Sequence, residues 1–290
     1  MSVPAAKLPL PQLAEMKRRG EKIVMVTAYD APGARFAEDA GVELILVGDT
    51  AAMVVLGHSG TTAVTMDEML FLTRTVVNAA RRPIVVGDMP FGSYQVSDED
   101  ALRNAIRFVK EAGADVVKLE GAGPSVSRAR AIVGAGIAVM GHVGLTPQSA
   151  TMLGGFKTQG RTAAEAARLV EGALELEAAG CFAIVLEAVP SPIAAEITKR
   201  LSVPTIGIGA GADCDGQVLV YHDLLGLTEG HLPRFVKRYA NLSGEIRDAL
   251  EAYVSEVRSG AFPEEQHTYA ISDEELAAFE ARVTTPTLDT

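Results

Sequence analysis

The sequence has only two cysteines, Cys181 and Cys214, and they do not form a CxxC pair. Because Cys181 opens an apolar run, we expect buried free thiols in a reducing compartment rather than a disulfide. Basic residues are also scarce: 26 Lys and Arg stand against 37 Asp and Glu, which gives a formal net charge of −11. This balance argues against nucleic acid or an anionic membrane as a partner, but it allows an anionic small molecule at a local positive site.

Long apolar segments are missing as well. The opening MSVPAAKLPLPQL lacks the basic region and apolar run of a signal peptide, and no apolar stretch approaches the ~20 residues of a membrane span. We therefore expect a cytoplasmic protein. With 48% hydrophobic and 22% charged residues, the composition is that of a globular protein with a sizeable core.

What the sequence does contain is a series of eight short apolar, β-branched runs, each followed by Gly, Asp or Pro. These runs occupy residues 22–30, 42–49, 82–88, 114–120, 136–142, 181–187, 203–209 and 217–223. They are continuous rather than alternating, which is typical of parallel strands covered on both faces. The sequence therefore predicts a parallel sheet.

Helical patterns lie between the runs. Two clear examples are residues 97–113 and 162–180, which begin with capping patterns at Ser97 and Thr162 and end in glycine. Eight alternating βα units predict a closed (β/α)8 barrel, and a single barrel of this kind commonly reaches ~250 residues. A doubly wound open sheet is the alternative, but no GxGxxG motif follows the first run.

In a (β/α)8 barrel the carboxyl ends of the strands share one rim, and that rim holds the active site. Polar residues stand at all but one of the expected strand ends: Tyr29 with Asp30, Asp49, Asp88, Lys118 with Glu120, His142, Glu187, and His222 with Asp223. One aspartate at a strand end is usually a helix N-cap. So many converging polar groups instead predict a functional site.

The carboxylates at this rim favour a hard metal ion. Two Asp and one Glu follow neighbouring strands, and no Cys or His pair has ligand spacing. Mg²⁺ takes oxygen ligands and is typically held by one or two carboxylates together with substrate and water. We expect Asp49 and Asp88 to be direct ligands, with Glu120 bound to the ion directly or one shell further out. The alternative is a salt-bridge network of these carboxylates with Lys118.

Three other rim residues have candidate roles. Lys118 lies two residues before Glu120, so both side chains point to the same face, which here is the barrel interior. A lysine buried there needs a carboxylate or an anionic substrate group as its partner, or else it forms a Schiff base. Glu187 is a candidate general base. His142 is a candidate for polarising a substrate carbonyl, although a single strand-end histidine is more often structural.

Two glycine-rich segments also bear on function. Residues 142–161, HVGLTPQSATMLGGFKTQGR, form a long loop with a Gly-Gly pair, and loops of this length in compact barrels are commonly lids. Residues 207–216, GIGAGADCDG, look like a phosphate loop but lack the Lys-Ser/Thr pair, so we expect a tight turn.

Seven segments stand out between about Lys22 and His267: VTAYDAPGARFAEDAGVELILVGDT, GDMPFGSY, VKLEG, GHVGLTPQS, GGFKTQGR, IGIGAG and DGQVLVYHDLLGL. Together and in register, they resemble the ketopantoate hydroxymethyltransferase (3-methyl-2-oxobutanoate hydroxymethyltransferase) family. The resemblance implies a TIM barrel of the phosphoenolpyruvate/pyruvate type and a cytoplasmic, Mg²⁺-dependent enzyme of pantothenate biosynthesis. Such an enzyme moves a one-carbon unit from 5,10-methylenetetrahydrofolate to 3-methyl-2-oxobutanoate, and it is commonly a homodecamer.

The resemblance also implies roles for individual residues. Asp49 and Asp88 match the family's metal ligands, and Glu120 matches its third metal-associated carboxylate. Asp49, Thr50, Asp88 and Lys118 match the keto-acid contacts, and Glu187 matches the proton acceptor. His142 is retained as a further substrate-binding candidate.

The chain departs from the family pattern at two positions. Thr50 stands where the family usually has Ser, so the hydroxyl survives but its methyl group narrows the space. Leu72 replaces a common His.

A keto-acid lyase or phosphonomutase of the same barrel type is the rival function, but such enzymes usually have a Cys in the lid loop, and residues 142–161 have none. A catalytically silent barrel is a further rival, which the intact rim residues disfavour.

We expect two parts in the chain. Residues 1–267 form a single catalytic barrel with an N-terminal helix, and residues 268–290 form an acidic C-terminal extension past the usual end of the family. Ser272 and Glu275 form a capping-box pattern in this extension, which predicts a short acidic helix.

Overall fold

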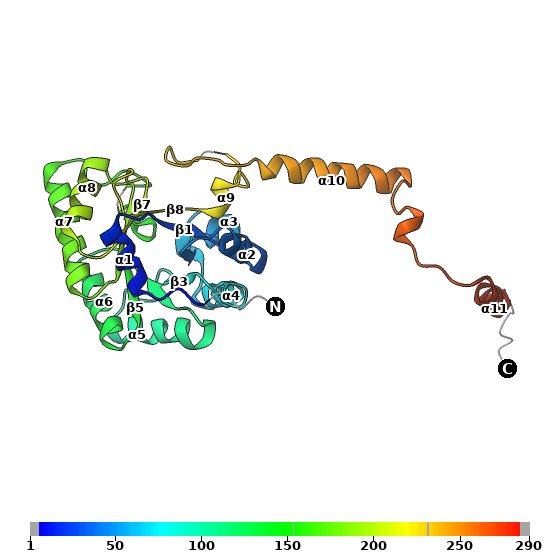
Figure 1. The fold of residues 1–290 in the computed structure, drawn as a ribbon, viewed down its shortest axis with the longest axis horizontal. Helices are drawn as coiled ribbons and strands as arrows, with labels where there is room; N and C mark the ends of the chain where they lie inside the picture. The colour runs from blue at the N-terminus through cyan, green and yellow to red at the C-terminus, as the bar shows by residue number, and fades with distance from the viewer. Residues whose placement is uncertain (1–5, 153, 231, 285–290) are drawn as a thin grey trace. The chain divides into compact units, whose positions relative to one another are not determined.

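The computed structural model describes residues 6–152, 154–230 and 232–284. Its eight strands form a closed parallel barrel in the order of the chain, which confirms the predicted (β/α)8 class (Figure 1). The strands are β1 Ile23–Thr27, β2 Leu44–Val47, β3 Ile84–Asp88, β4 Val116–Lys118, β5 Ala138–Gly144, β6 Ala183–Glu187, β7 Thr205–Ile208 and β8 Gly216–Leu219. The barrel closes where β1 pairs with β8, with Met25 beside Val218.

The continuous apolar character of the strands arises because both faces of the sheet are buried. In β2, Leu44 and Leu46 join a cluster with Ile84 and Met140 from other strands, which fills the barrel interior. The alternate residues of β2, Ile45 among them, join the larger cluster between the sheet and the surrounding helices. Neither side of the strand therefore has positions that tolerate solvent.

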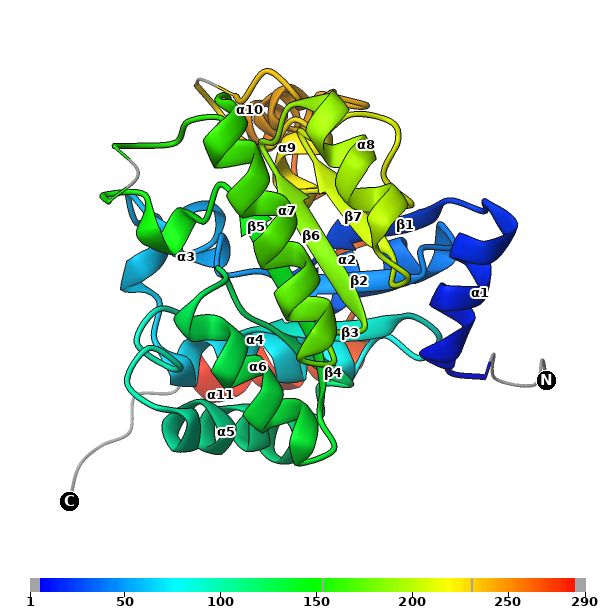
Figure 2. The same cartoon turned by 90° about the vertical axis from the view of Figure 1, so that its left-hand side faces the viewer.

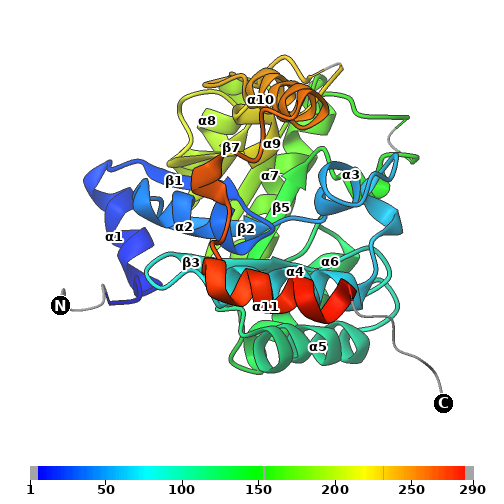
Figure 3. The same ribbon diagram turned by 90° about the vertical axis from the view of Figure 1, so that its right-hand side faces the viewer.

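Helix α1 Pro11–Arg19 precedes the first strand and places Leu13 and Met16 in the interior cluster. The later helices, most of which cover the outside of the barrel, are α2 Ala31–Asp39, α3 Ala51–Val54, α4 Met66–Val77, α5 Asp98–Arg107, α6 Pro124–Gly134, α7 Ala163–Ala178, α8 Ser191–Arg200 and α9 Tyr221–Leu224, with shorter turns η1 Thr61–Ala63, η2 Phe108–Ala112 and η3 Pro147–Ser149. Helix α7 contacts β5 and β6 (Figure 2), and α2 contacts α4 (Figure 3). Both predicted caps are present: Ser97 and Thr162 accept hydrogen bonds from the backbone three residues ahead.

One expected βα unit is incomplete. No helix separates β7 from β8, because residues 209–215 alone connect them, a segment too short for a crossover helix. Gly209 and Gly211 there have positive φ values of 66° and 89°, which only glycine adopts easily. The expected tight turn is therefore present, but the prediction of eight regular βα repeats was wrong at this point.

Both cysteines are free and buried, as expected. Burial raises the pKa of the Cys181 thiol to about 12. At pH 8 a thiol with that pKa has about one thiolate in 10⁴, whereas an unperturbed cysteine has roughly a quarter.

We therefore expect iodoacetamide to modify Cys181 more than about 10³-fold more slowly in the folded protein than in guanidinium, because only the thiolate reacts. Peptide mass spectrometry of timed samples measures both rates. Similar rates in the two conditions would show that the thiol is accessible.

The chain divides into two compact units, Met1–Ala240 and Asn241–Thr290. The second unit contains α10 Leu242–Ser259, η4 Glu265–His267 and α11 Asp273–Thr284. The predicted helix in the extension is present, with Ser272 Oγ accepting from the Glu275 amide at 3.3 Å. Residues 285–290 of the extension lie outside the described residues. No described helix combines the length and the apolar character that a membrane crossing requires.

The unit boundary after Ala240 reflects internal contacts, whereas the predicted division after residue 267 reflects sequence resemblance. The first boundary separates compact units, and the second marks where the family likeness ends. The candidate site residues discussed below all belong to the first unit.

Candidate active site

Strand periodicity brings most of the predicted residues into the barrel. The side chains of Val86, Val116, Met140 and Val185 belong to the interior cluster. Two residues further along each strand, on the same inward face, stand the site residues Asp88, Lys118, His142 and Glu187. All four lie toward the carboxyl ends of their strands, where (β/α)8 barrels place their active sites.

Asp49 also lies at this end of the barrel, but a turn rather than a strand positions it. It follows the end of β2, in the turn that leads into α3, and its backbone N–H donates to Asp88 Oδ2 at 3.0 Å. The Lys118 ammonium lies 2.7 Å from Asp88 Oδ1 and 3.9 Å from Glu120 Oε1. The four side chains are between 1% and 5% exposed. The structure therefore brings together the predicted carboxylates and their lysine.

The lysine does not balance the buried negative charge. Burial raises the pKa of Asp49 well above its usual value, and the neighbouring charges of Asp88 and Glu120 raise it further. Burial also opposes the charge of Lys118, but the surrounding carboxylates outweigh this effect and hold its pKa above the usual value. A site with this charge distribution favours an additional cation.

The donor set suits a hard divalent cation. Asp49 and Asp88 offer carboxylate oxygens at adjoining strand ends, and Mg²⁺ sites typically use one or two carboxylates and leave the other positions to water and substrate. Within residues 6–152, 154–230 and 232–284, no three His, Cys, Asp or Glu side chains form a ready-made ligand group. The role of Glu120 as a metal-associated carboxylate stays a prediction.

His142 lies between two carboxylates. Its Nε2 is 3.2 Å from Glu187 Oε2, and its Nδ1 is 3.5 Å from Glu120 Oε1. Neither contact has the alignment of a good hydrogen bond, so the attraction is mainly that of an ion pair. Burial alone lowers the pKa of His142, but these two carboxylates outweigh it and raise the pKa to about 9. The two carboxylates therefore favour the protonated form of His142.

Some predicted rim residues do not join this cluster. Asp30 is exposed and accepts from the Gly33 amide at 2.7 Å, so it is the helix N-cap that a single strand-end aspartate usually is. His222 and Asp223 belong to α9, and Asp223 accepts from the Thr228 hydroxyl at 2.6 Å. Tyr29 borders the cluster: it is buried against the His222 ring, and burial together with the charges of Asp49 and Asp88 raises its pKa. Fewer of the predicted strand-end residues therefore converge on the site than the sequence suggested.

The two departures from the family pattern differ in position. Thr50 is half-buried at the start of α3, directly after Asp49, so its hydroxyl lies next to the carboxylate cluster along the chain. Leu72 is buried in α4 and belongs to the apolar cluster between helices and sheet. A leucine suits that packing environment.

Two uncharged residues of the site were missed from the sequence. Gln148, in η3, donates from Nε2 to Asp49 Oδ2 at 2.9 Å, and the Tyr94 hydroxyl donates to Gln148 Oε1 at 2.6 Å. Both lie in the segments GHVGLTPQS and GDMPFGSY, but a neutral side chain in a loop has neither periodicity nor charge to single it out.

The fold and this acidic rim define a (β/α)8-barrel enzyme. Similar folds occur in phosphonopyruvate hydrolase in complex with oxalate and Mg²⁺ and in 2,3-dimethylmalate lyase, a member of the PEP mutase/isocitrate lyase superfamily. The first has a TM-score of 0.57 and 15% identity over 95% of this chain and 99% of that chain. The second has a TM-score of 0.54 and 15% identity over 94% of this chain and 98% of that chain. At such identities the likeness concerns the fold alone.

Sequence comparison identifies the family. The sequence model for ketopantoate hydroxymethyltransferase matches residues 7–265. The 3-methyl-2-oxobutanoate hydroxymethyltransferase of Moorella thermoacetica is 58% identical over 91% of this chain and 98% of that relative. The enzyme of the same name from Carboxydothermus hydrogenoformans is 55% identical over 91% and 96%. The chain belongs to the ketopantoate hydroxymethyltransferase family, which confirms the resemblance found in its sequence.

Proposed function

We propose that the chain transfers a hydroxymethyl group from 5,10-methylenetetrahydrofolate to 3-methyl-2-oxobutanoate and so forms ketopantoate. The supporting observation is the buried carboxylate–lysine cluster beside the His142–Glu187 pair, in a barrel whose relatives are named for this reaction. In the balanced reaction, the C3–H bond of the keto acid breaks and C3 bonds to the one-carbon unit. Water supplies the hydroxyl group, and tetrahydrofolate leaves.

Asp49 and Asp88 are the residues that would hold a divalent cation, and Mg²⁺ fits their oxygen donors. When bound, the cation supplies Lewis-acid stabilisation of the negative charge that develops on the keto oxygen. Glu120 contributes further negative charge close to these two residues, as its effect on the pKa of Asp49 indicates.

Lys118 and Thr50 bind the keto acid in this proposal. Lys118 neutralises the substrate carboxylate, because its ammonium stays charged beside Asp88. A Schiff base would require a neutral amine, which this environment disfavours. The Thr50 hydroxyl adds a hydrogen bond at the start of α3. Both ring nitrogens of His142 face carboxylates, so its part in substrate binding is to hold Glu187 and Glu120 beside the keto acid.

Glu187 is the proposed general base that removes the C3 proton. It ends β6 on the inward face, and its side chain is 16% exposed, more than the carboxylates around Lys118. Its carboxylate faces His142 at 3.2 Å, and the imidazolium holds it in place beside the site. The two neighbouring carboxylates favour the protonated form of His142, and an imidazolium has no lone pair with which to accept that proton.

A lyase or phosphonomutase activity is the alternative, since the structural neighbours include such enzymes. Their identities of 15% to 17% concern the fold alone, whereas the hydroxymethyltransferases are more than 50% identical to this chain. The loop that follows β5 has no cysteine either. Both observations favour one-carbon transfer.

The direct test is product analysis. We expect the protein, Mg²⁺, 3-methyl-2-oxobutanoate and 5,10-methylenetetrahydrofolate to yield ketopantoate and tetrahydrofolate, measured by mass spectrometry. Parallel reactions without folate, with phosphonopyruvate or with 2,3-dimethylmalate, serve as controls. Cleavage of either control substrate without any ketopantoate would favour the lyase alternative.

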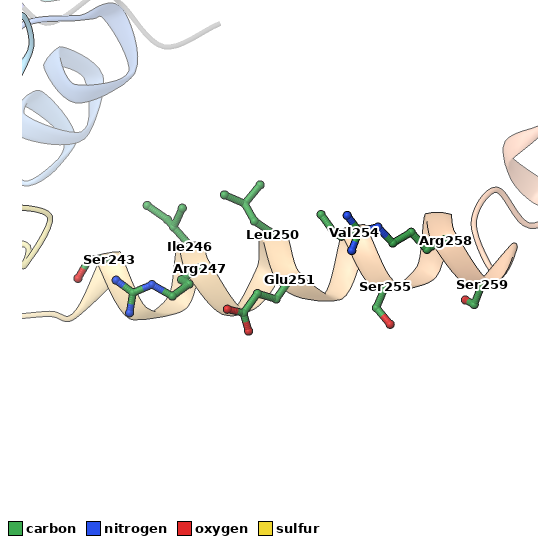
Figure 4. Close-up of a pocket in the computed structure, with 9 residues that line it drawn as sticks. All are labelled: Ser243, Ile246, Arg247, Leu250, Glu251, Val254, Ser255, Arg258 and Ser259. Carbon is green, nitrogen blue, oxygen red and sulfur yellow. The ribbon is translucent and has the colours of Figure 1, made fainter.

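We also propose a cytoplasmic homo-oligomer, with α10 as a contact between copies. No residue of α10 is buried. Ile246, Leu250 and Val254 lie on one side of this helix, four residues apart, whereas Glu251 and Ser255 point away from that side (Figure 4). Helices of this kind gain most of their stability by packing an apolar face, and a second copy of the chain supplies a matching face by symmetry.

We therefore expect wild-type protein to elute at a multiple of its 30.4 kDa chain mass in size exclusion with light scattering. Leu250→Asp should shift it to smaller species, because it places a charge in the apolar contact, and Ser255→Asp should not. A wild-type monomer would contradict the proposal. Unchanged mass with a lower Tm in Leu250→Asp would instead indicate packing within one chain.

A further inference from the structure

The loop after β5 returns Gln148 to the barrel mouth. The chain turns at Gly144, which has a φ of 104°, and a Cβ there would lie 2.2 Å from the Glu187 carbonyl oxygen. Leu145 then donates to that carbonyl at 2.8 Å, and η3 begins at Pro147. As a result Gln148 is only 6% exposed, in a loop that otherwise includes well-exposed residues such as Met152.

Hydrogen bonds fix the orientation of the Gln148 amide. The Tyr94 hydroxyl accepts from the Glu120 backbone N–H at 3.2 Å, so its own proton is free to be donated to Gln148 Oε1 at 2.6 Å. On the other side, the carbonyl of Met89 lies 3.0 Å from Gln148 Nε2, and a carbonyl only accepts. Reversing the amide would place two acceptors together at Met89, so the nitrogen must face that carbonyl.

The second amide proton then has a defined partner. Gln148 Nε2 donates to Asp49 Oδ2 at 2.9 Å, and the backbone N–H of Gln148 donates to Glu120 Oε2 at 3.1 Å. One residue thus contacts the carboxylates that follow β2 and β4. Two buried carboxylates repel each other, and these hydrogen bonds offset part of that repulsion.

We propose that Gln148 is a positioning residue, locked by Tyr94, that holds the Asp49 and Glu120 carboxylates in the arrangement that binds the divalent cation. This inference rests on the proposed metal role of Asp49. Groups that orient metal ligands typically change metal affinity by ~10–100-fold when they are removed.

The test measures cation binding directly, by Mg²⁺ titration calorimetry and by Mn²⁺ electron paramagnetic resonance on the full chain. We expect Gln148→Ala to weaken binding ~10–100-fold, because the Asp49 carboxylate loses its fixed orientation. Saturating Mg²⁺ should restore much of the lost kcat. Gln95→Ala is the matched control: Gln95 Nε2 contacts the same Oε1 at 3.3 Å from an exposed position, and its loss should change affinity less than about twofold.

Tyr94→Phe tests the hydrogen bond from the Tyr94 hydroxyl to Gln148 Oε1, because it removes the hydroxyl and keeps the buried ring. We expect Tyr94→Phe to weaken cation binding, as Gln148→Ala does. The double variant should lose less cation affinity than the product of the two single fold-losses, because Tyr94 acts largely through Gln148. This coupling also separates positioning from a general loss of stability, which circular dichroism melts record independently.

The outcomes distinguish the inference from the proposed function. Normal Mg²⁺ affinity in folded Gln148→Ala or Tyr94→Phe, with a wild-type protein that binds the ion, would overturn the positioning role alone. A wild-type protein that binds no divalent cation, with or without keto acid, would overturn the metal site and this inference together.

Discussion

In D₂O, the protein with Mg²⁺ and 3-methyl-2-oxobutanoate should exchange the C3 hydrogen of the keto acid for deuterium without any folate. Removal of this proton precedes carbon–carbon bond formation, so the half-reaction needs only the base and the bound keto acid. Glu187→Gln keeps the shape of the side chain but cannot accept a proton. A positioned base contributes typically ~10²–10⁴-fold, so we expect exchange to slow by about that factor.

Proton NMR of the C3 position follows this exchange over time. Keto-acid binding, measured by calorimetry, should change much less in Glu187→Gln, because Lys118 and the carboxylates proposed to bind the metal are intact. His142→Gln is the comparison variant, since it alters the neighbour that lies 3.2 Å from Glu187 but keeps the carboxylate itself, and exchange should slow less than in Glu187→Gln. Wild-type exchange in Glu187→Gln together with loss in His142→Gln would transfer the role to His142.

The inward position of Glu187 follows from sequence periodicity. Once a run is recognised as a buried parallel strand, residues two apart share a face, and this accounts for Asp88, Lys118, His142 and Glu187. Asp49 breaks the rule, because Leu44 and Leu46 point inward and an extended strand would turn residue 49 outward. The turn into α3 brings the Asp49 side chain back toward the barrel, so its strand-end position and the family resemblance predicted it, but strand periodicity did not.

Loop residues mark the limit of this reasoning. Gln148 and Tyr94 reach the carboxylates through an irregular loop and a turn, whose paths depend on packing that no local pattern encodes. Asp30 shows the opposite error: strand-end position suggested a site, but a local hydrogen bond to the Gly33 amide makes it a cap. The helix expected between β7 and β8 is absent because the connection is too short, a property that the strand pattern does not reveal.

Removal of the metal should have an effect comparable to the loss of the base. We expect EDTA to lower turnover by about 10³-fold and Mg²⁺ to restore it, because Lewis-acid stabilisation of a developing oxyanion is worth several kcal/mol. The steady-state rate of ketopantoate formation, measured before and after dialysis, tests this expectation. Tetrahydrofolate release provides a second readout of the same turnover.

Substitution of Asp88 separates the metal from the fold. Asp88→Ala should abolish metal-dependent keto-acid binding, but it also removes the 2.7 Å partner of buried Lys118, and breaking a buried pair costs about 3–5 kcal/mol. Asp88→Asn is the closer variant in shape: its amide oxygen can still accept from Lys118, as Asp88 Oδ1 does, while the charge is gone and the acceptor for the Asp49 N–H is lost. We expect it to fold, by circular dichroism, and to bind keto acid equally with and without Mg²⁺. Normal turnover in the chelated protein, or Mg²⁺-dependent binding in Asp88→Asn, would show that Asp88 is not a metal ligand.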